Sequence, residues 1–594
     1  MFESYRLIWG ILTAPERRRM ALLTVLTICM SILEVVGVAG VLPFLSVLND
    51  PTLLDTQPIL VGFADFMGTT DARDTTIALG LAVFALVVVS MAVRALVTYA
   101  QIRFSLMRAY TVSARLLRGY LQQDYVWYLS RNTSDLGQSL LSEVDVVIRE
   151  SVLPSVLVIS NILIVFLIGG LLFLVEPVVA IGATGLLMSV YLTVFFVMRR
   201  RLGEVGKRRM AANGARFHVV QEVAGGLKEI KVMGLETQSL KRFRTPAREM
   251  ARNQTLGLVI QRLPRFALEA ATYGGFILMV LMLVIVQGED IGTLLPLLGL
   301  IGMSATKLFP ALQQMFQQLS AIRFSRPALA RLHDSLQGLA PPQVEADVPP
   351  LRLRDKMELK GLEFRYPEGE RNTLTGFNAT IPAFTTLGIV GGTGAGKTTV
   401  IDMILGLLVP DAGEILVDGE EVSKDRIRAW QKSLGYVPQH IFLSDDTVAA
   451  NIAFGSGGEI DMEAAERAAR VANLHDFVMN EMPDGYMTRV GERGVRLSGG
   501  QRQRIGIARA MYQDPDVLIL DEATSALDNL TERAVMDAVH ALSGKKTVIM
   551  IAHRLSTVRA CDMIFLLEGG KLAAKGSYDE LVAENENFRR MASE

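Results

Sequence analysis

The residues best suited to chemistry form a glycine-rich segment in the second half of the chain, Gly391-Gly392-Thr393-Gly394-Ala395-Gly396-Lys397-Thr398-Thr399. It follows the apolar run Leu387–Val390 and leads into another at Val400–Leu408, so we expect a strand, a loop and a helix. The glycines let backbone N–H groups turn toward phosphate oxygens, and the helix N-terminus adds a partial positive charge. This spacing predicts a phosphate-binding loop in which Lys397 reaches the β- and γ-phosphates of a nucleotide and Thr398 binds Mg²⁺.

Further polar motifs accompany this loop. They are Gln439, Leu497-Ser498-Gly499-Gly500-Gln501, the apolar run Val517–Leu520 followed by Asp521-Glu522, Ser525-Ala526-Leu527-Asp528, and His553. In their order along the chain and their residue types, these motifs resemble those of the nucleotide-binding domain of the ATP-binding cassette (ABC) family. The resemblance covers the chain from about Met357 onward, and LSGGQ downstream of a phosphate-binding loop is a highly specific signal. It implies a P-loop α/β domain that binds ATP and Mg²⁺.

The resemblance assigns roles to three residues outside the loop. Tyr366 precedes the loop, where family members stack an aromatic ring on adenine, although a lone tyrosine is more often a packing residue. Gln439 matches the glutamine that touches Mg²⁺ and the attacking water. His553 follows the apolar run Val548–Ala552 and matches the residue that contacts the γ-phosphate. We therefore expect Tyr366 to bind the nucleotide, and Gln439 and His553 to take part in hydrolysis.

Two adjacent carboxylates end a predicted strand. Asp521 closes the apolar run and would hold Mg²⁺, while Glu522 points to the other side of the strand end and can orient and deprotonate the attacking water. Neighbouring carboxylates with different roles are what in-line hydrolysis of ATP needs. The predicted metal ligands are Thr398, Gln439 and Asp521, and the predicted catalytic residues are Glu522, His553 and Gln439.

The LSGGQ segment has a different task in the family. There it binds the ATP held by the phosphate-binding loop of a second domain, so that two domains enclose two nucleotides. This chain carries one such domain, and the resemblance therefore implies a homodimer with two competent sites. The residues expected to complete the partner's site are Ser498, Gly499, Gly500 and Gln501.

The composition divides the 594-residue chain into two different parts. Hydrophobic residues make up 50% of the chain and the mean hydropathy is +0.33, which is high for a soluble protein. The apolar excess lies before about residue 325. A formal net charge of −1 disfavours nucleic acid as a general partner. Cys29 and Cys561 fall in different parts and are expected to be structural thiols.

Six stretches are long and apolar enough to cross a bilayer, which needs about 20 residues each. They lie near 20–46, 76–100, 152–175, 177–198, 258–287 and 291–320. A single one could be a buried globular helix, but six in series favour a transmembrane domain. Acidic residues dominate the connection after the first span, whereas Arg199–Arg201 and Lys207–Arg209 follow the fourth. The positive-inside rule therefore predicts a multi-pass protein of the inner (plasma) membrane with both termini in the cytoplasm.

We thus predict an α-helical six-span transmembrane domain followed by an α/β P-loop ABC nucleotide-binding domain. Residues 1–19 have too short an apolar stretch for a signal peptide, and we expect an amphipathic segment at the cytoplasmic surface. Pro341-Pro342 and Pro349-Pro350 indicate a linker between the domains. The expected domains are the interfacial segment 1–19, the transmembrane domain 20–325, the linker 326–356 and the ATPase domain 357–594.

Three short helices are expected outside the spans. The cytoplasmic connections 101–150 and 199–255 read as helical continuations of the spans with turns between them. In ABC exporters such extensions carry coupling helices that dock on the ATPase domains, and Asp124–Tyr128 and Glu222–Ile230 are the candidates; ordinary turns are the alternative. A third helix, in the outer connection, would lie on the outer leaflet or fill a gap between spans. Its apolar face consists of Ile59, Leu60, Phe63, Phe66 and Met67.

Ionisable residues fall inside the predicted spans. A charged side chain that faces lipid costs several kcal/mol, so such residues usually face a bundle interior or an aqueous cavity. Arg94, Arg265 and Lys307 lie in separate spans and suggest a cavity for an anionic substrate. Alternatively, Glu34 and Glu269 neutralise nearby cations, or the long side chains reach the membrane surface.

A membrane domain followed by an ATPase domain resembles an ABC exporter half-transporter of type IV. Within this group the sequence most resembles lipid-linked oligosaccharide flippases, which implies ATP-driven export or flipping of an anionic, lipid-linked or otherwise amphipathic substrate. An exporter of drugs, apolar lipids or peptides is the alternative, and a non-transporting ATPase that regulates another membrane protein is a further one. Where the flippases can carry a further cation after Pro310, this chain has Gln313 and Gln314. The points of likeness are Glu34, Pro43-Phe44, the outer helix, Arg94-Ala95-Leu96, Pro264-Arg265, Glu269 and Lys307-Leu308-Phe309-Pro310.

Overall fold

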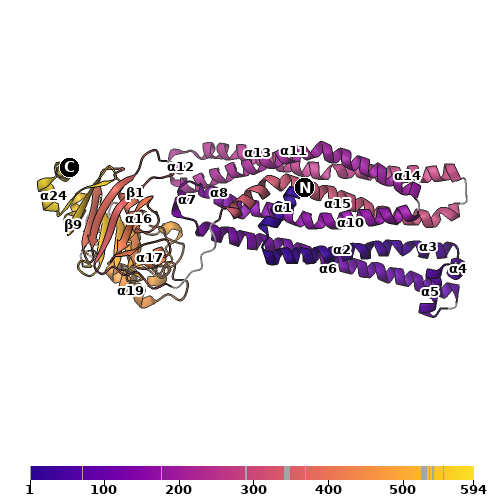
Figure 1. Ribbon diagram of the computed structural model, residues 1–594, viewed down its shortest axis with the longest axis horizontal. Coiled ribbons are helices and arrows are strands. Elements are labelled where there is room, and N and C mark those ends of the chain that lie inside the picture. The colour runs from indigo at the N-terminus through magenta and orange to yellow at the C-terminus, as the bar shows by residue number, and fades with distance from the viewer. Residues whose placement is uncertain are drawn as a thin grey trace. The chain divides into compact units, whose positions relative to one another are not determined.

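The structure is a computed structural model of the chain (Figure 1). Its described residues form two compact units, Met1–Gln123 with Arg131–Gln343, and Asp124–Ser130 with Val344–Glu594. In the described residues the first unit is helical throughout and the second combines helices with strands. The described residues are 2–69, 71–175, 177–287, 291–339, 348–367, 369–522, 532–533, 536–537, 539, 541–552 and 554–593.

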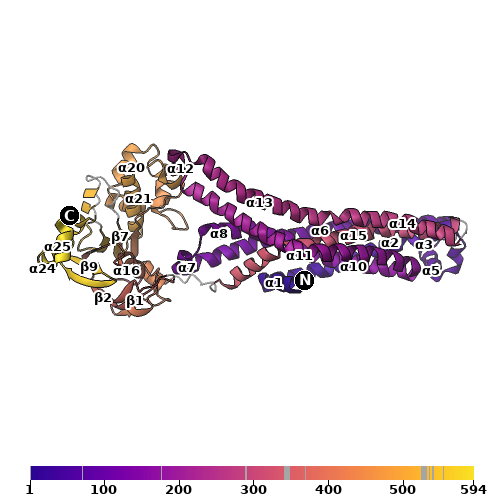
Figure 2. The same ribbon diagram turned by 90° about the horizontal axis from the view of Figure 1, so that it is seen from above.

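Long helices dominate the first unit. Helices α6, α11 and α15 contain 50, 49 and 47 residues. At about 1.5 Å per residue, each is long enough to cross a bilayer and to extend beyond it. Helix α2 packs along α6, α10 along α15, and α11 along α13 (Figure 1, Figure 2). The elements of this unit are α1 (Phe2–Ile11), α2 (Ala14–Ala39), α3 (Val41–Asn49), α4 (Leu53–Thr56), α5 (Pro58–Met67), α6 (Ala72–Leu121), α8 (Thr133–Gln138), the π-helix η1 (Ser139–Glu143), α9 (Val144–Val147), the π-helix η2 (Ile148–Val152), α10 (Leu153–Val175), α11 (Pro177–Gly225), α12 (Leu227–Met233), α13 (Glu236–Arg262), α14 (Pro264–Gln287) and α15 (Ile291–Gln337).

Within the described residues, three helical stretches are long and apolar enough to span a membrane, namely Ala14–Leu48, Ala72–Leu121 and Thr133–Val175. They contain the first three predicted spans. The other predicted spans fall on α11, on α13 with α14, and on α15, where many side chains lie outside the described part of the chain. The membrane region is therefore helical, and the number of six spans stays a prediction.

Two of the predicted spans consist of two helices each, with a proline near the break. Helices α2 and α3 meet at Gly40, because Pro43 has no N–H to donate to the carbonyl of Ala39. Helices α13 and α14 meet at Leu263, because Pro264 suits the first position of a new helix. The first and fifth predicted spans therefore each contain a helix break beside a proline.

Helix α15 covers the first residues of the expected linker. It continues to Gln337, because Ala328, Leu329 and Leu332 extend its buried face. Residues 340–347 lie outside the described residues. The domain boundaries, with the start of the linker at residue 326, stay predictions.

The N-terminal segment packs on the helices of the first unit. In α1 the side chains of Ile8 and Ile11 are buried, and the Tyr5 hydroxyl donates to the Ser155 carbonyl at 2.9 Å. Its position at a membrane surface stays a prediction.

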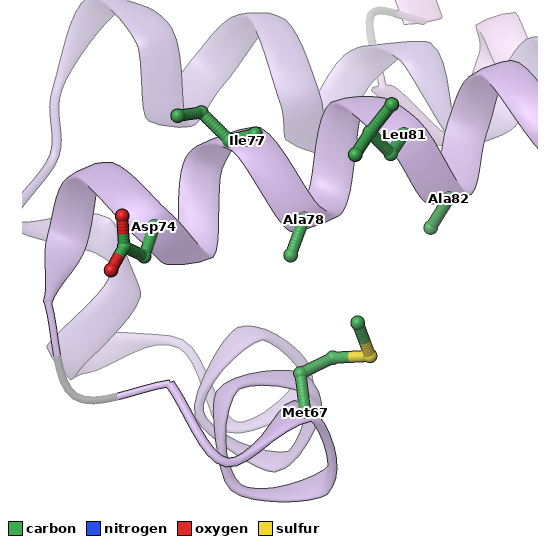
Figure 3. Close-up of a pocket in the computed structure, with 6 residues that line it drawn as sticks. All are labelled: Met67, Asp74, Ile77, Ala78, Leu81 and Ala82. Atoms are coloured by element: carbon green, nitrogen blue, oxygen red, sulfur yellow. The ribbon is translucent and has the colours of Figure 1, made fainter.

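The outer helix α5 divides its apolar residues between two environments. Leu60 is buried in a small apolar cluster, whereas Ile59 and Phe66 are exposed. Leu60 supports the gap-filling interpretation, and the exposed residues are compatible with a place on the outer leaflet. Beside this helix, a pocket of about 490 Å³ separates Met67 from one side of α6 (Figure 3). The residues of α6 that line it are Asp74, Ile77, Ala78, Leu81 and Ala82.

The second unit is built on two sheets. Strands run in the order β2-β1-β4-β5 in one and β10-β9-β3-β8-β7-β6 in the other. In the larger sheet β9, β3, β8, β7 and β6 are parallel, so their carboxyl ends meet at one edge. The elements are α7 (Tyr125–Leu129), β1 (Lys356–Phe364), β2 (Leu374–Pro382), β3 (Thr386–Gly391), α16 (Lys397–Ile404), β4 (Ala412–Val417), β5 (Glu420–Glu421), α17 (Ile427–Gln431), β6 (Leu434–Val437), α18 (Val448–Ile452), α19 (Met462–Val471), α20 (His475–Glu481), the 3₁₀ helices η3 (Gly485–Met487) and η4 (Glu492–Gly494), α21 (Gly499–Met511), β7 (Val517–Asp521), β8 (Thr547–Ile551), α23 (Leu555–Val558), β9 (Met563–Glu568), β10 (Lys571–Gly576), α24 (Tyr578–Glu584) and α25 (Glu586–Ser593).

The larger sheet is covered on both faces. Val548 and Met550 of β8 belong to one buried cluster, and the alternate residues Ile549 and Ile551 belong to another. Because successive side chains of a strand point to opposite faces, apolar residues at every position predict a strand buried on both sides. This explains why β3, β7 and β8 read as continuous apolar runs.

Both short helices expected in the cytoplasmic connections are present. Helix α7 belongs to the second unit, where Val126 packs against one of its two core clusters. Helix α12 begins at Leu227, after a break at Gly226, so the second candidate starts later than Glu222. Docking of these helices on ATPase domains stays a prediction.

Candidate functional site

The phosphate-binding segment forms the predicted strand, loop and helix. It leaves the carboxyl end of β3, a central strand, and enters α16 at Lys397. Gly394 and Gly396 have φ angles of 80° and 97°, which favour glycine. A Cβ atom on Gly396 would lie 2.9 Å from a Leu374 methyl group, whereas one on Gly392 would meet nothing. The loop is thus packed against the protein on one side and open on the other.

Lys397 provides a buried positive charge over this loop. Its Nζ donates to the carbonyl oxygens of Gly391 and Gly392 at 2.7 and 3.1 Å, and the residue is 7% exposed. Burial lowers the pKa of its ammonium group, and the negative charges of Glu522 and Asp521 oppose that effect. A buried ammonium group bonded to neutral carbonyls fits an anionic ligand such as a nucleotide phosphate.

Tyr366 lies beside the loop, as the sequence predicted. Its hydroxyl is 3.2 Å from the Thr399 hydroxyl, and its ring meets the Phe364 ring edge-on at 5.0 Å. The ring is partly buried against the core of the second unit. Tyr366 is thus held next to α16, and its contact with adenine stays a prediction.

The two carboxylates lie at the end of β7, each with a donor from the neighbouring strand β6 or the loop after it. The Gln439 side-chain amide donates to Glu522 Oε2 at 2.6 Å. The Tyr436 hydroxyl donates to Asp521 Oδ2 at 3.4 Å. Glu522 has a φ of 50°, so the chain turns directly after Asp521 and the two carboxylates leave the strand differently.

A third carboxylate, Asp402, lies on α16 near Asp521. Burial, reinforced by the negative charge of Asp521, raises the pKa of the Asp402 carboxyl to about 6. Neither Asp402 nor Tyr436 was among the residues predicted from the sequence. A local signal was available for Asp402, which is four residues after Thr398 on a helix, whereas the contact of Tyr436 depends on the pairing of β6 with β7.

These side chains fit a hard divalent cation. Thr398, Gln439 and Asp521 offer hydroxyl, amide and carboxylate oxygens, which suit Mg²⁺. Among the described residues, no group of three or more His, Cys, Asp or Glu side chains is arranged so that it could hold a metal ion by itself. A magnesium ion at this edge would therefore take its other ligands from water and from nucleotide phosphates.

The LSGGQ segment forms the start of α21. Ser498 is its N-cap, and a capping box joins it to Gln501. The Gln501 amide nitrogen donates to Ser498 Oγ at 3.2 Å, and the Ser498 amide nitrogen donates to Gln501 Oε1 at 2.8 Å. Gly499 and Gly500 are the first helical residues, so backbone N–H groups gather at this end. Such an end can bind an anion.

Two predicted features lie outside the described residues. They are His553 and the segment Ser525–Asp528.

In the first unit, Glu34 brings two of the predicted cations together. Glu34 Oε1 accepts from Arg94 Nη1 at 2.5 Å and from Lys307 Nζ at 2.9 Å. The Glu34 side chain is 4% exposed, whereas those of Lys307 and Arg94 are 20% and 40% exposed. Three helices, α2, α6 and α15, therefore meet at a cluster of two cations and one carboxylate.

The third predicted cation lies in a different pair. Arg265 Nε donates to Glu269 Oε1 at 2.9 Å, one turn further along α14. The structure thus joins Arg94 with Lys307 and leaves Arg265 in a local pair. The neutralising pairs considered from the sequence are formed, although two cations share one carboxylate at Glu34.

Comparisons with known proteins define the family. A model described as ABC transporter matches residues 374–525, and one described as ABC transporter transmembrane region matches residues 21–304. An uncharacterized ABC transporter ATP-binding protein of Sinorhizobium fredii is 33% identical over 554 residues, which cover 88% of this chain and 89% of that protein. The chain belongs to the ABC transporter family.

Other similar proteins narrow the class. An ATP-dependent lipid A-core flippase of Cupriavidus pinatubonensis is 34% identical over 420 residues, which cover 67% of this chain and 68% of that protein. One of Bordetella pertussis is 33% identical over 469 residues, covering 77% and 72%. A bacterial Atm1-family ABC exporter solved with ATP bound shares the fold, with a TM-score of 0.77, 24% identity, and coverage of 98% of this chain and 99% of that chain.

The order of the two parts gives the particular kind of ABC transporter. A transmembrane region at 21–304 precedes an ATPase domain on the same chain, as in a fused exporter half-transporter. The protein is therefore a multi-pass membrane protein whose ATPase domain binds and hydrolyses ATP to drive transport.

Proposed function

We propose that this chain is a flippase that moves a lipid with an anionic, lipid-linked-oligosaccharide-like head group across the inner membrane. The observation that carries the proposal is the shared pairing of Arg94 and Lys307 with Glu34. Two cations on one carboxylate leave a net positive charge among predicted spans. Relatives named as lipid A-core flippases support a lipid as the cargo.

The exposure of the cluster supports a ligand role. A charge inside a membrane is costly unless it is paired or reaches water, and only Glu34 is fully buried here. Arg94 keeps 40% of its side chain exposed, so its guanidinium can accept a second anion while it remains bonded to Glu34. A guanidinium group matches phosphate oxygens in a bidentate manner, and Lys307 adds a second positive charge.

Arg265 is a second candidate for contact with the anionic head group. Its side chain is 52% exposed and pairs only locally with Glu269 in the described residues. The proposed head-group site therefore consists of Arg94 and Lys307, with Arg265 as a separate contact on the entry path of the head group.

In the ATPase domain, the proposed roles follow from the site. ATP supplies the transferable phosphoryl group, and Mg²⁺ offsets its charge. The Gly391–Thr399 loop would hold the phosphates, Asp521 and Thr398 the metal ion, and Tyr366 the base. Glu522, held by Gln439, would orient and deprotonate the attacking water, with His553 as the γ-phosphate contact.

We further propose that the chain acts as a homodimer, with six spans and both termini in the cytoplasm. The capped N-terminus of α21 offers backbone N–H groups and Ser498 to a phosphate. Cysteines placed at Ser498 and Thr393 should cross-link between chains when ATP is trapped. Full ATPase activity from a demonstrably monomeric preparation would contradict this arrangement.

The test of the flippase proposal uses the full chain in proteoliposomes. A fluorescent polyprenyl-pyrophosphate sugar is the charged substrate, and the matching uncharged polyprenyl sugar is its comparison. In Arg94→Ala, Glu34 keeps Lys307 as its partner, so no buried carboxylate is left alone. We expect Arg94→Ala with Arg265→Ala to lower pyrophosphate-lipid flipping relative to ATP hydrolysis measured without lipid.

One control variant and two possible outcomes distinguish the flippase from the alternative functions. Arg149→Ala, which removes an exposed cation from a surface pair, is the control and should flip lipid normally. A folded double variant that flips the pyrophosphate lipid at the normal rate favours an exporter of drugs, apolar lipids or peptides. A parent protein that hydrolyses ATP but moves neither lipid, with no stimulation by either, favours a regulatory ATPase.

A further inference from the structure

The carboxylate proposed to hold Mg²⁺ has its own hydrogen-bond donor. Tyr436 lies on β6, directly beside β7, and the pairing places Tyr436 opposite Ile519. From there the phenol reaches the end of β7 and donates to Asp521 Oδ2 at 3.4 Å. This is the longer of the two hydrogen bonds at the edge.

The Tyr436 ring is fixed while its hydroxyl faces the site. The ring packs, partly buried, against the core cluster that also contains Ile519 and Ile551. The phenol therefore lies at a fixed position from which its hydroxyl donates to Asp521.

Strand β6 and the loop after it thus provide a separate hydrogen-bond donor for each of the two carboxylates. Gln439 holds Glu522 at 2.6 Å, and Tyr436 holds Asp521 at 3.4 Å. The two carboxylates are consecutive in the chain, and like charges at this spacing repel each other. Separate donors keep one carboxylate on the metal side and the other on the water side.

We infer that Tyr436 is a positioning residue that orients Asp521 toward the metal ion bound with the nucleotide. The inference rests on the proposed role of Asp521 as a metal ligand. Asp402 makes this task more demanding, because it places another carboxylate near Asp521. Without the phenol, the Asp521 carboxylate would lose one of the contacts that orient it, and it would hold the metal ion less well.

The test measures metal binding directly. The full chain in nanodiscs, with ADP, is titrated with Mn²⁺ as the probe and followed by electron paramagnetic resonance. Tyr436→Phe removes the hydroxyl and keeps the ring, so we expect Mn²⁺ binding to weaken about three- to tenfold, the usual effect of one hydrogen bond of ordinary strength. Binding of a fluorescent ADP analogue in EDTA should stay unchanged, because the loop and Tyr366 are untouched.

Tyr486→Phe is the matched control. Its hydroxyl also makes one hydrogen bond, to His475 Nδ1 at 2.8 Å, on elements away from this edge. The control should leave Mn²⁺ affinity unchanged. Equal Mn²⁺ affinities in Tyr436→Phe and the parent, or equal losses in both tyrosine variants, would overturn the inference.

A further variant, Asp521→Asn, tests the proposed metal site separately from the role of Tyr436. Asp521→Asn should abolish most Mn²⁺ binding if Asp521 is a metal ligand. If Asp521→Asn binds Mn²⁺ normally, the proposed metal site is wrong and Tyr436 has no ligand to position. If Asp521→Asn loses Mn²⁺ and Tyr436→Phe does not, the metal site stands and the positioning role alone is wrong.

Discussion

The charged residues of the two units are placed in opposite ways. In the ATPase unit, Lys397 bonds to Gly391 and Gly392, six and five residues away, and Asp521 and Glu522 are consecutive. In the helical unit, Glu34 finds Arg94 and Lys307 at separations of 60 and 273 residues. The backbone of one strand or loop positions the first group, whereas three separate helices must pack correctly to form the second.

This difference has an energetic consequence. At the ATPase edge, Asp521 and Glu522 lie partly exposed, so their loss should affect chemistry more than folding. Several charges of the helical unit are buried in pairs instead. Arg209 and Glu143 are 4% and 3% exposed, and Arg108 and Glu16 are 6% and 8% exposed. Removing one member of such a pair leaves an uncompensated charge in the interior.

The largest effect is expected at the ATPase edge. Glu522→Gln should retain MgATP binding and hydrolyse ATP at least about a hundredfold more slowly, because the amide cannot accept a proton from water. Turnover and nucleotide binding are measured on the same preparation. Lys397→Ala is the contrasting variant, and it should weaken nucleotide binding itself. Near-normal turnover in Glu522→Gln would remove this residue from the proposed mechanism.

The next effect concerns stability in the helical unit. Glu143 accepts from Arg209 at 2.5 Å and from Asn213 and Gln138 at 2.9 and 3.1 Å. Glu143→Ala removes the carboxylate that is bonded to the buried Arg209 guanidinium and leaves only the weaker attraction of Glu150, so it should cost about 3 kcal/mol of stability.

Thermal unfolding in detergent measures the stability lost in Glu143→Ala. A variant of an exposed ion pair on the same segment of the chain is the control. Arg149 bonds Asp145 at 2.9 Å, and their side chains are 64% and 48% exposed. Arg149→Ala should change stability by less than about 0.5 kcal/mol. Similar shifts in both variants would show that burial does not distinguish these pairs.

A smaller effect is expected for the local membrane pair. Arg265 is 52% exposed and Glu269 lies one turn away on the same helix, so Arg265→Ala should cost about 0.5 kcal/mol or less. A loss of lipid flipping in this variant, at nearly unchanged melting temperature, then reports on substrate contact. A large drop in melting temperature would instead identify Arg265 as a structural residue.

A further effect on stability depends on pH. The pKa of the Asp402 carboxyl is raised to about 6, so the folded protein holds a proton that the unfolded chain releases at lower pH. Stability therefore falls as pH rises through about 4 to 6, and stays lower above that window. Asp402→Asn removes this penalty.

We expect Asp402→Asn to be more stable than the parent at pH 7.5 by about 1 kcal/mol, after allowance for solvent screening. The advantage should shrink at pH 5. Thermal unfolding without nucleotide and Mg²⁺ at both pH values measures it. An advantage that is equal at both pH values would exclude ionisation of Asp402 as its cause.

The sequence predicted most of the ATPase site because its motifs are local. A phosphate-binding loop needs glycines, a lysine and a hydroxyl at fixed spacing between a strand and a helix, and all are consecutive in Gly391–Thr399. The end of an apolar strand likewise predicts where Asp521 and Glu522 emerge. Tyr436 escaped prediction because its role depends on the pairing of β6 with β7, which no local pattern specifies.

In the helical unit, the sequence by itself determined that charges lie within apolar spans, and tertiary structure decided their partners. A hydropathy pattern locates Glu34, Arg94 and Lys307, but the packing of α2, α6 and α15 sets which of them meet. The ends of the helices likewise depend partly on local sequence and partly on tertiary packing. Pro43 and Pro264 lie beside breaks for a local reason, whereas α15 continues past Arg326 because the other helices bury its next turns. A helix break depends on a residue and its neighbours in the chain, so the sequence predicts it. An ion pair between distant helices forms because a buried charge is costly without a partner, and only the packing of the helices decides which partner is near.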